Sequence, residues 1–534
     1  MSEESHPVIL TTNKVVRDMA LLHAPRALLH GMAFGGLVVV AILLRVFAFQ
    51  GYADSDPRDY TILAHDLAHG ILHLPAYDGP PVFPLRLGVY GPTALLIKGF
   101  GLSETTLALY PFLVSIAACL LAYALARILW GPRAGLMGMA IWAVLPMDIK
   151  MASLLYPDAI AAFWANVGVA LAYLACTRSP SRPLVLCTVL SGLAFGVSWL
   201  CKETVTYLGP FVVILVVLLS RQPALKGRIL SLVSIGGSAL VVLSLEMLFF
   251  HKMTGDALFH LHATEQNYVY AAVWFFDQSS PHFGWQSGGY AQALVTRLLL
   301  EGPKQIAASF HALPAFGALA LAWALVLRHR SFAVLGTWLV TLLVMFNFMT
   351  TSFQAYKPLP LLERYRYPLL LPSSLLVAGF LTMLLTSAHD AIIRKERILW
   401  ACVLMLIYGA FSLPTIRELR RARPEQIERI VASKLTASDV VYTDYRTASS
   451  LVFFRTGLLV PDTSTTIPYE HVNLLEMPRG SYVLIDTDMT NAMTLSYQYQ
   501  RPTFVEAPPQ AWKKVWADMN AVLYQIPAPP VSNP

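Results

Sequence analysis

Residues 28–50 read LLHGMAFGGLVVVAILLRVFAFQ, and residues 52–60 continue as YADSDPRDY, so an apolar run passes directly into an acidic loop. A helix that crosses a lipid bilayer needs about 20 mostly apolar residues. Residues 28–50 are long enough to do so. Three aspartates, Asp54, Asp56 and Asp59, follow where such a helix would leave the bilayer. The sequence therefore predicts a membrane protein with acidic groups at the water boundary.

The composition of the whole chain agrees with this interpretation. Of its 534 residues, 56% are hydrophobic and only 13% are charged, whereas an ordinary soluble domain has roughly 25% charged residues. These values exclude a set of soluble domains, a disordered chain and a collagen-like repeat. The predicted fold class is mostly α, a polytopic membrane protein with about 11 transmembrane helices. The candidate spans are 28–50, 106–127, 134–147, 159–176, 183–200, 204–220, 229–250, 311–327, 331–350, 368–387 and 398–416.

Basic residues in the loops indicate the orientation of these spans. With the N-terminus in the cytoplasm, six short inside segments together carry fifteen Lys and Arg residues, whereas the outside turns 148–157 and 200–203 hold one Lys each. Multispanning proteins show this excess of positive charge in their cytoplasmic loops. The polar stretch before the first span is too long for a cleavable signal peptide. An odd number of spans then places everything after residue 416 outside.

Two parts of the chain are distinguished by composition. Residues 1–416 form the predicted transmembrane domain, with long external loops at 51–105 and 251–310. Residues 417–534 carry equal numbers of basic and acidic residues and short alternating apolar segments at Val440–Tyr442 and Tyr482–Ile485. These features predict a small soluble α/β domain on the outer side of the membrane. We expect its Pro-rich tail, from Ile526 onward, to fray.

The first external loop contains a predicted amphipathic helix. After Pro57, apolar residues recur at helical spacing from Tyr60 to Ile71. Such a helix is expected to lie in the membrane interface, with one side in lipid. Asp56 would be its N-cap and Pro57 its first residue. Capping is therefore one explanation for Asp56, and a functional carboxylate is the other.

Four short motifs lie on the predicted outer side: residues 56–60 (DPRDY), 155–158 (LYPD), 198–203 (SWLCKE) and 364–372 (RYRYPLLLP). They resemble motifs of the GT-C membrane glycosyltransferases, which include the protein O-mannosyltransferases and the lipid A aminoarabinose transferases. The first motif departs from the family pattern, because Pro57 stands where many members have Glu and the second acid is displaced to Asp59.

The resemblance implies a reaction. Family members transfer a sugar from a polyprenyl-phosphate carrier to an acceptor hydroxyl, usually with inversion, and they work on the outer face of a membrane. A carboxylate must take the acceptor proton. Asp56 is the expected general base, and Asp158 and Asp59 are further catalytic candidates. For Asp158 the alternative is favourable placement in the first turn of a helix.

Cationic side chains must hold the lipid phosphate and stabilise it as it leaves. The alternative for such residues is that they reach the lipid headgroups from the ends of spans, or belong to the aromatic belt in the case of a Tyr. Arg366 also lies on the outer side. The candidates for phosphate binding are Arg86, Lys202, Arg58, Arg364 and Tyr365.

Other ionisable residues have less defined expectations. Arg45 and Glu246 lie inside apolar runs, where a charge is costly; we expect Arg45 to pair with acids of the loop and assign Glu246 no partner. The external loop 251–310 carries histidines and a tryptophan that fit no metal-ligand spacing, so it is interpreted as a lid: His260, His262, His282 and Trp285. No cofactor is predicted. Some members of the family need Mg or Mn and others do not, and no motif here decides between them.

The expected partners are a polyprenyl-phosphate-linked sugar donor, a lipid, glycan or protein acceptor, and membrane lipids, with no nucleic acid. The resemblance implies a bacterial inner membrane as the location. A transporter or flippase for lipid-linked saccharides is the main alternative, since it would have similar spans. Transporters more often show internal repeats and charges at mid-membrane. A non-catalytic scaffold that binds lipid-linked sugars is the other alternative.

Overall fold

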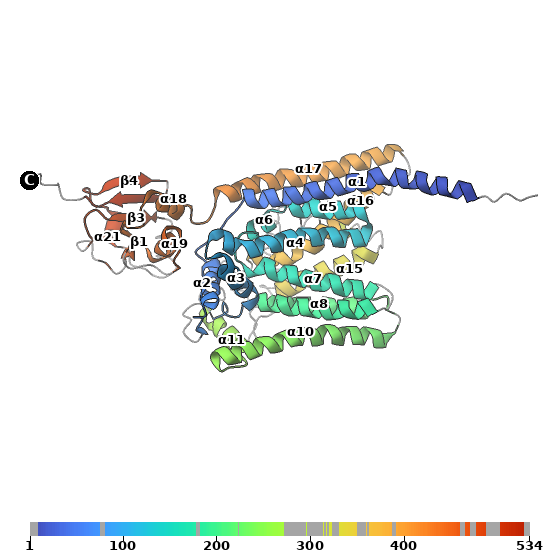
Figure 1. Cartoon of the computed structure of the whole chain (residues 1–534), viewed down its shortest axis with the longest axis horizontal. Coiled ribbons are helices and arrows are strands. Elements are labelled where there is room, and N and C mark those ends of the chain that lie inside the picture. The colour runs from blue at the N-terminus through green and yellow to red at the C-terminus, as the bar shows by residue number, and fades with distance from the viewer. Residues whose placement is uncertain are drawn as a thin grey trace, which may run out of the picture.

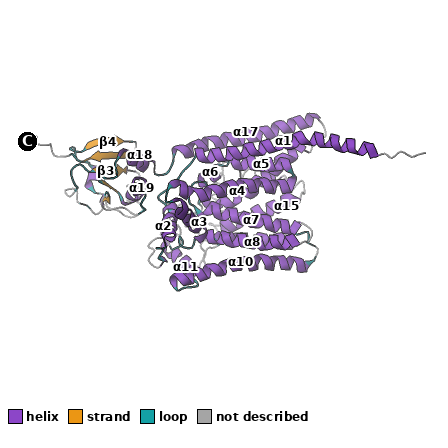
Figure 2. Ribbon diagram, viewed as in Figure 1, coloured by secondary structure: helices purple, strands orange, loops and turns teal. Residues whose placement is uncertain are grey.

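The computed structural model describes residues 9–74, 81–177, 182–222, 224–271, 330–349, 362–386, 391–459, 465–469, 477–487, 502–518 and 520–527, with a few single residues between them. A helical bundle makes up most of this part of the chain, and a small sheet domain adjoins one of its ends (Figure 1). Among the described residues, helices dominate and the strands lie in the C-terminal domain (Figure 2). The predicted fold class is confirmed.

Seven helical segments of the described chain are long and apolar enough to cross a membrane: Ala27–Phe47, Glu104–Trp130, Pro157–Thr177, Leu225–Thr254, Arg330–Phe348, Arg364–Leu385 and Cys402–Lys434. They belong to α1 (Ile9–Phe47), α4 (Glu104–Trp130), α7 (Pro157–Thr177), α10 (Leu225–Thr254), α15 (Arg330–Phe348), η5 (Glu363–Leu369) with α16 (Leu370–Thr386), and α17 (Ala391–Arg421), which leads into α18 (Gln426–Lys434).

The predicted count of eleven spans is not confirmed. The segments at 183–200 and 204–220 are the shorter apolar helices α8 (Arg182–Cys201) and η2 (Glu203–Leu208) with α9 (Gly209–Val217). The segment at 134–147 is α5 (Pro132–Ala143), whose 12 residues rise only about 18 Å and cannot cross a bilayer alone. Most of the segment at 311–327 lies outside the described residues.

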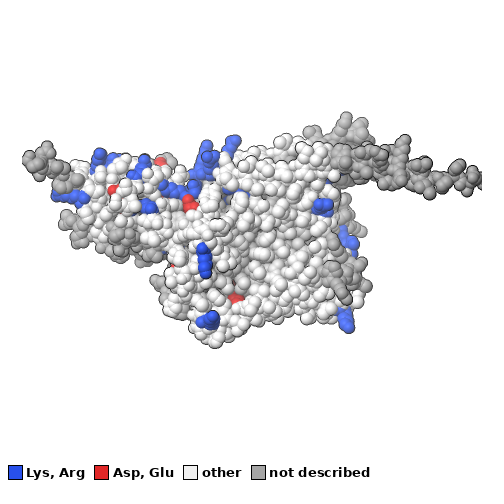
Figure 3. Space-filling model, viewed as in Figure 1, with Lys and Arg blue, Asp and Glu red and all other residues white. Residues whose placement is uncertain are grey.

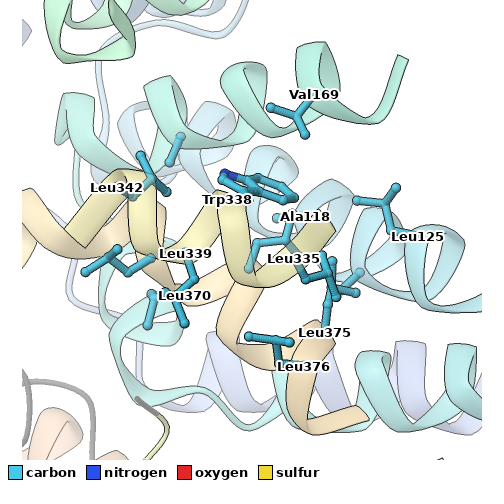
Figure 4. Close-up of a cluster of buried hydrophobic side chains, with 14 of the residues drawn as sticks. Ala118, Leu125, Val169, Leu335, Trp338, Leu339, Leu342, Leu370, Leu375 and Leu376 are labelled. Atoms are coloured by element: carbon cyan, nitrogen blue, oxygen red, sulfur yellow. The ribbon is translucent and has the colours of Figure 1, made fainter. Parts of the chain in front are cut away.

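The bundle has an apolar outer surface and a close-packed interior. A broad band without charges separates the charged ends in the view of Figure 3, and α1 and α10 expose rows of Leu and Val. The interior contains the fully buried rings of Trp142 and Trp338. In Figure 4, Trp338 of α15 lies among leucines of α15 and α16, with Val169 of α7 above it. Such a surface is what lipid requires of a folded chain.

Helices α8 and α10 approach each other closely through two glycines. A Cβ atom on Gly196 would lie 2.6 Å from the Cβ of Val242, and one on Gly192 would overlap the carbonyl oxygen of Ile235. Small residues four positions apart allow the backbones of membrane helices to touch. This contact fixes which residues of α8 and α10 face each other toward the end of the bundle that adjoins the C-terminal domain.

The first external loop contains two helices, α2 (Asp56–His69) and α3 (Leu87–Phe100). Asp56 is not the N-cap: Ser55 holds that position, without a side-chain capping bond, and Asp56 is the first helical residue. The apolar stripe of α2, including Tyr60 and Leu63, packs with residues of α3. The predicted helix is therefore confirmed, but protein rather than lipid covers much of its apolar face.

The C-terminal domain contains a five-stranded mixed sheet. Its strands are β1 (Val441–Thr443), β2 (Thr466–Pro468), β3 (Tyr482–Asp486), β4 (Lys513–Ala517) and β5 (Ala521–Gln525), in the order β2-β1-β3-β5-β4. β1 pairs in parallel with β2 and β3, whereas β5 is antiparallel to β3 and β4. The helices α18, α19 (Tyr445–Thr456) and α21 (Thr503–Glu506) complete it. Both strands predicted from alternation are present.

The C-terminal domain is attached to the bundle by an ion-pair cluster at Glu104, the first residue of α4. Arg429 of α18 pairs with both oxygens of this carboxylate, and Arg423 Nη2 lies 3.2 Å from Oε2. The ring of Tyr52 stacks on Phe453 of α19 at 4.2 Å. Helix α17 continues past residue 416 to Arg421, so a single helix leads from the membrane to this contact.

We predict that Glu104→Gln loosens the C-terminal domain. The amide can accept hydrogen bonds from only one of its terminal atoms, so the charge-assisted pairing with Arg429 is lost, at a cost of about 2 kcal/mol. Limited proteolysis of the detergent-solubilised protein should then release the domain several times faster. Glu506→Gln, at an exposed carboxylate of α21, is the control. Equal cleavage rates in the two variants would contradict the prediction.

Candidate active site at the end of the bundle beside the C-terminal domain

Two carboxylates and two cations meet at the end of the bundle that adjoins the C-terminal domain. Arg364 Nη1 lies 2.8 Å from Asp56 Oδ2, and Lys202 Nζ lies 2.5 Å from Asp158 Oδ1. Arg364 Nε is 4.0 Å from Asp158 Oδ2, which connects the two pairs. These residues come from four segments that are far apart in the sequence. The structure thus brings four of the predicted site residues into one cluster.

Aromatic rings hold both cations. The ammonium of Lys202 lies 3.7 Å from the ring centroid of Tyr365, and the guanidinium of Arg364 lies 4.8 Å from that of Tyr156. A cation above an aromatic face is attracted by the ring quadrupole, by about 0.5–2 kcal/mol. The hydroxyl of Tyr156 is in turn 2.9 Å from Ser55 Oγ, beside Asp56. Tyr365 was predicted to belong to the site, whereas Tyr156 was quoted only as part of a motif.

Each side chain is placed by the end of a helix. Asp56 begins α2, Asp158 is the second residue of α7 after Pro157, and Lys202 follows the last residue of α8. Pro at the start of α7 favours the helical conformation there, and the helix N-terminus favours a carboxylate. The Asp158 side chain is only 2% exposed, against 26% for Asp56. Of the two carboxylates, Asp56 is therefore the one that a molecule in solution can reach.

A pocket borders this cluster between α7, α8, η2 and α15. Its polar lining includes Asp158 and Tyr365, together with Ser198 and Thr204. The remaining lining is apolar and consists of Ala161, Ala162, Ala165, Val205, Leu208, Leu342, Phe346 and Pro368. A pocket lined by Asp158, a few polar groups and apolar walls, next to two cations, suits an amphiphile whose polar group is held at the water boundary.

Asp59 and Arg366 lie close to members of the cluster along the chain. Asp59 is half-buried on α2, three residues after Asp56, and Arg366 is buried in η5, two residues after Arg364. Their roles stay predictions.

Arg86 is not part of the cluster around Asp56. It lies directly before α3, is 4% exposed and forms a two-pronged pair with Glu203, in which Nη2 is 3.0 Å from Oε1. Gly88 makes this possible, since a Cβ there would be 2.6 Å from the Sγ of Cys201 at the end of α8. Glu203 is adjacent to Lys202. Arg86 therefore borders the candidate site with its charge already compensated.

Arg58, another candidate for phosphate binding, lies at the contact with the C-terminal domain. Its Nε lies 3.4 Å from Asp54 Oδ1 and its guanidinium lies 5.9 Å from the ring of Tyr445 in the C-terminal domain. The backbone N–H of Asp54 donates to Glu425 Oε1 at 2.8 Å. Burial raises the pKa of the Asp54 carboxyl to about 7, which Arg58 opposes and Glu425 reinforces. Arg58 thus takes part in the contact between the loop and the C-terminal domain.

The raised pKa of Asp54 predicts a pH-dependent stability. The folded protein holds this proton where the unfolded chain has lost it, so its stabilising contribution is complete below about pH 4 and is lost as the pH rises through about 7. The thermal midpoint of the purified protein should therefore fall between pH 5 and pH 8. Asp54→Asn should flatten this profile, and Glu506→Gln, at an exposed acid, should not. An unchanged profile in Asp54→Asn would refute the assignment.

A second polar cluster lies buried behind the first. Arg45 pairs with Asp148 of α6 (Pro146–Met151), and both side chains have no exposed surface. Ser115 Oγ donates to Asp148 Oδ2 at 2.5 Å, and the hydroxyl of Tyr367 donates to Oδ1. Tyr367 belongs to the same 3-10 helix, η5, as Arg364 and Tyr365. Arg45 does pair with an acid, as predicted, but with Asp148 rather than with the aspartates at 54–59.

We predict that Tyr367→Phe destabilises the protein by about 1–3 kcal/mol, because it removes a hydrogen bond to a fully buried carboxylate. Tyr408→Phe is the matched control, since its buried hydroxyl donates to the carbonyl of Ile141 at 3.4 Å rather than to a carboxylate. Thermal unfolding in detergent compares the two. Equal losses of stability would mean that the hydroxyl of Tyr367 is no more important than that of Tyr408.

The remaining candidates lie around α10 and α11 (Phe259–Ala271). His260 pairs with Glu246, and His262 pairs with Asp256 on an exposed surface. His282 and Trp285 lie outside the described residues, so the proposed lid is untested. Within the described residues, no group of three or more His, Cys, Asp or Glu side chains is arranged to hold a metal ion.

Comparison with known proteins adds independent findings. Residues 88–246 match the dolichyl-phosphate-mannose-protein mannosyltransferase family. No curated protein matches the chain. The structure is similar to that of ArnT from Cupriavidus metallidurans bound to undecaprenyl phosphate, with a TM-score of 0.54 and 15% identity over 93% of this chain and 98% of that chain.

Two more solved structures are similar. ArnT from Cupriavidus metallidurans in the apo state gives a TM-score of 0.52 and 16% identity over 92% of this chain and 98% of that chain. The oligosaccharyltransferase AglB from Archaeoglobus fulgidus, with an inhibitory peptide and a dolichol-phosphate, gives 0.51 and 13% over 86% of this chain and 70% of that one. The chain therefore has the fold of the GT-C membrane glycosyltransferases, as its motifs predicted.

Proposed function

We propose that this protein is a glycosyltransferase that moves a sugar from a polyprenyl-phosphate donor to an acceptor hydroxyl at the outer face of a bacterial inner membrane. The observation that carries the proposal is the pairing of the accessible carboxylate Asp56 with Arg364, beside Lys202 and Asp158, next to a pocket with apolar walls. The similar ArnT structure contains undecaprenyl phosphate, and that of AglB contains a dolichol-phosphate.

The phosphate of the donor is held by Lys202 and Arg364 in this proposal. Both cations are adjacent to Tyr365 and to the polar end of the pocket, while the alanines of α7 offer an apolar surface to the carrier chain. A guanidinium offers a fork of donors and an ammonium a point charge. Their present carboxylate partners keep both cations in position until the phosphate shares them.

Asp56 acts as the general base. The acceptor oxygen attacks the anomeric carbon, its proton passes to Asp56, and the bond from that carbon to the phosphate oxygen breaks with its electron pair going to the phosphate. Lys202 and Arg364 stabilise the charge that develops there. Attack opposite to the leaving phosphate inverts the anomeric configuration. Asp158 is buried against Lys202 and positions its ammonium group. It does not take the acceptor proton.

The location follows from the same arrangement. Helices α2, α3, α6 and α11 lie at the end of the bundle that adjoins the C-terminal domain (Figure 1). The excess of basic residues in the opposite loops predicts that this end faces outward, so the C-terminal domain would be periplasmic and the N-terminus cytoplasmic. The acceptor is a lipid, a glycan or a protein that reaches this face.

We predict that Asp56→Asn lowers the rate of sugar transfer at least 100-fold, the usual contribution of a general base, while the protein still binds undecaprenyl phosphate. Asp66→Asn, at another half-buried acid of α2, should transfer normally. Mass spectrometry of envelope glycans and lipids, with and without the chain, identifies the transferred sugar and its acceptor. Unimpaired transfer by Asp56→Asn would overturn the role of Asp56, and transport of a lipid-linked sugar without any transfer would favour a flippase.

A further inference from the structure

A third polar cluster joins three helices at the outer end of the bundle. His260 Nδ1 of α11 lies 2.9 Å from Glu246 Oε1 of α10, and Trp199 Nε1 of α8 donates to Glu246 Oε2 at 2.8 Å. The rings of Trp199 and His260 are stacked, with centroids 4.7 Å apart. Glu246 and His260 are 3% and 7% exposed. The sequence assigned no partner to Glu246, and here both of its oxygens are bonded.

The backbone brings these residues together. The contacts of Gly192 and Gly196 with α10 fix the register of the two helices. Three residues after Gly196, Trp199 then meets Glu246, which lies one turn after Val242. Helix α11 follows the end of α10 and returns His260 to the same place. A carboxylate inside a membrane helix is costly, and this arrangement compensates Glu246 with two donors.

One nitrogen of the His260 ring makes no hydrogen bond within the described structure. This atom, Nε2, is buried. A carboxylate only accepts, so the bond to Glu246 places a proton on Nδ1 and leaves Nε2 as the nitrogen without a partner. An unmet buried polar atom costs about 1–3 kcal/mol. A ring that is oriented on one side by Glu246 and Trp199, with its other nitrogen unbonded, is arranged to form a hydrogen bond with a bound molecule.

The cluster is adjacent to the proposed phosphate site. Trp199 lies about one helical turn before Lys202, which directly follows α8; Trp199 contacts Glu246 of α10, and Lys202 contacts Asp158 of α7. His260 also interacts electrostatically with Glu203, which follows Lys202 and pairs with Arg86. The sugar of the donor is bonded directly to the phosphate, and a sugar ring is about as long as a helical turn.

We propose that His260 contacts the donor, and that its Nε2 forms a hydrogen bond with a hydroxyl group of the sugar bound to the carrier phosphate; a hydroxyl can donate as well as accept. This inference rests on the proposed function and deepens it. Glu246 and Trp199 are positioning residues, because they act through the ring of His260. The proposal predicts that the cluster distinguishes a sugar-bearing carrier from a bare one.

The test measures binding of two kinds of probe to the full-length protein in detergent: undecaprenyl phosphate, and a panel of undecaprenyl-phosphate hexoses and aminopentoses. The wild type should bind at least one sugar-bearing probe more tightly than the bare lipid. His260→Ala should weaken binding of that probe about tenfold, the effect of one hydrogen bond, and leave undecaprenyl phosphate unchanged. Because His260→Gln keeps a polar, hydrogen-bonding side chain, it serves as a second variant if the alanine protein does not fold.

The exposed neighbour His262 is the matched control, since it lies on the same helix and also pairs with a carboxylate; His262→Ala should bind both probes as the wild type does. Equal weakening of both probes by His260→Ala and His260→Gln would mean a structural role and would overturn the inference, as would the absence of any effect. Failure of the wild type to bind undecaprenyl phosphate at all is a separate outcome, which would refute the proposed function as well.

Discussion

The site depends on the mutual compensation of charges at the edge of an apolar bundle. Neither a carboxylate nor a cation is stable there alone, and each of Asp56, Asp158, Lys202 and Arg364 is paired with an opposite charge. Helix termini from distant parts of the chain must converge for this to happen. The same requirement explains why Asp158 is more buried than Asp56: one carboxylate serves mainly to hold Lys202, and the other keeps a face open to incoming molecules.

Buried polar clusters next to the site fix the positions of the helices that carry its side chains. Arg45 and Asp148 lie where an isolated charge would be very costly, and breaking a buried pair of this kind typically destabilises a protein by about 3–5 kcal/mol. Their bond to Tyr367 connects this pair to the short helix that carries Arg364 and Tyr365. The glycine contacts between α8 and α10 fix the position of the end of α8, which Lys202 follows. The positions of the reactive side chains are thereby set by the packing of the bundle.

The sequence identified the fold and the central cluster, because spans and motifs are local features. Asp56, Asp158, Lys202, Arg364 and Tyr365 all lie in short motifs and all meet. The partners of Arg58 and Arg86 could not be read in the same way, since they depend on how distant segments approach. One signal for the second polar cluster was present in the sequence. Asp148 and Arg45 each lie in a largely apolar stretch, where a lone charge is costly, and such charges usually pair with one another. Three strands lacked clear alternation and were missed.

The fastening of the C-terminal domain has an architectural consequence. Its residues stack on Tyr52, bond the backbone of Asp54 and lie over Arg58, all within four positions of Asp56. The extramembrane module is therefore part of the wall that supports the reactive carboxylate. A chain cut after α17 would lose both arginine partners of Glu104 and the side chains that cover this loop. The helical bundle and the C-terminal domain therefore form one functional unit.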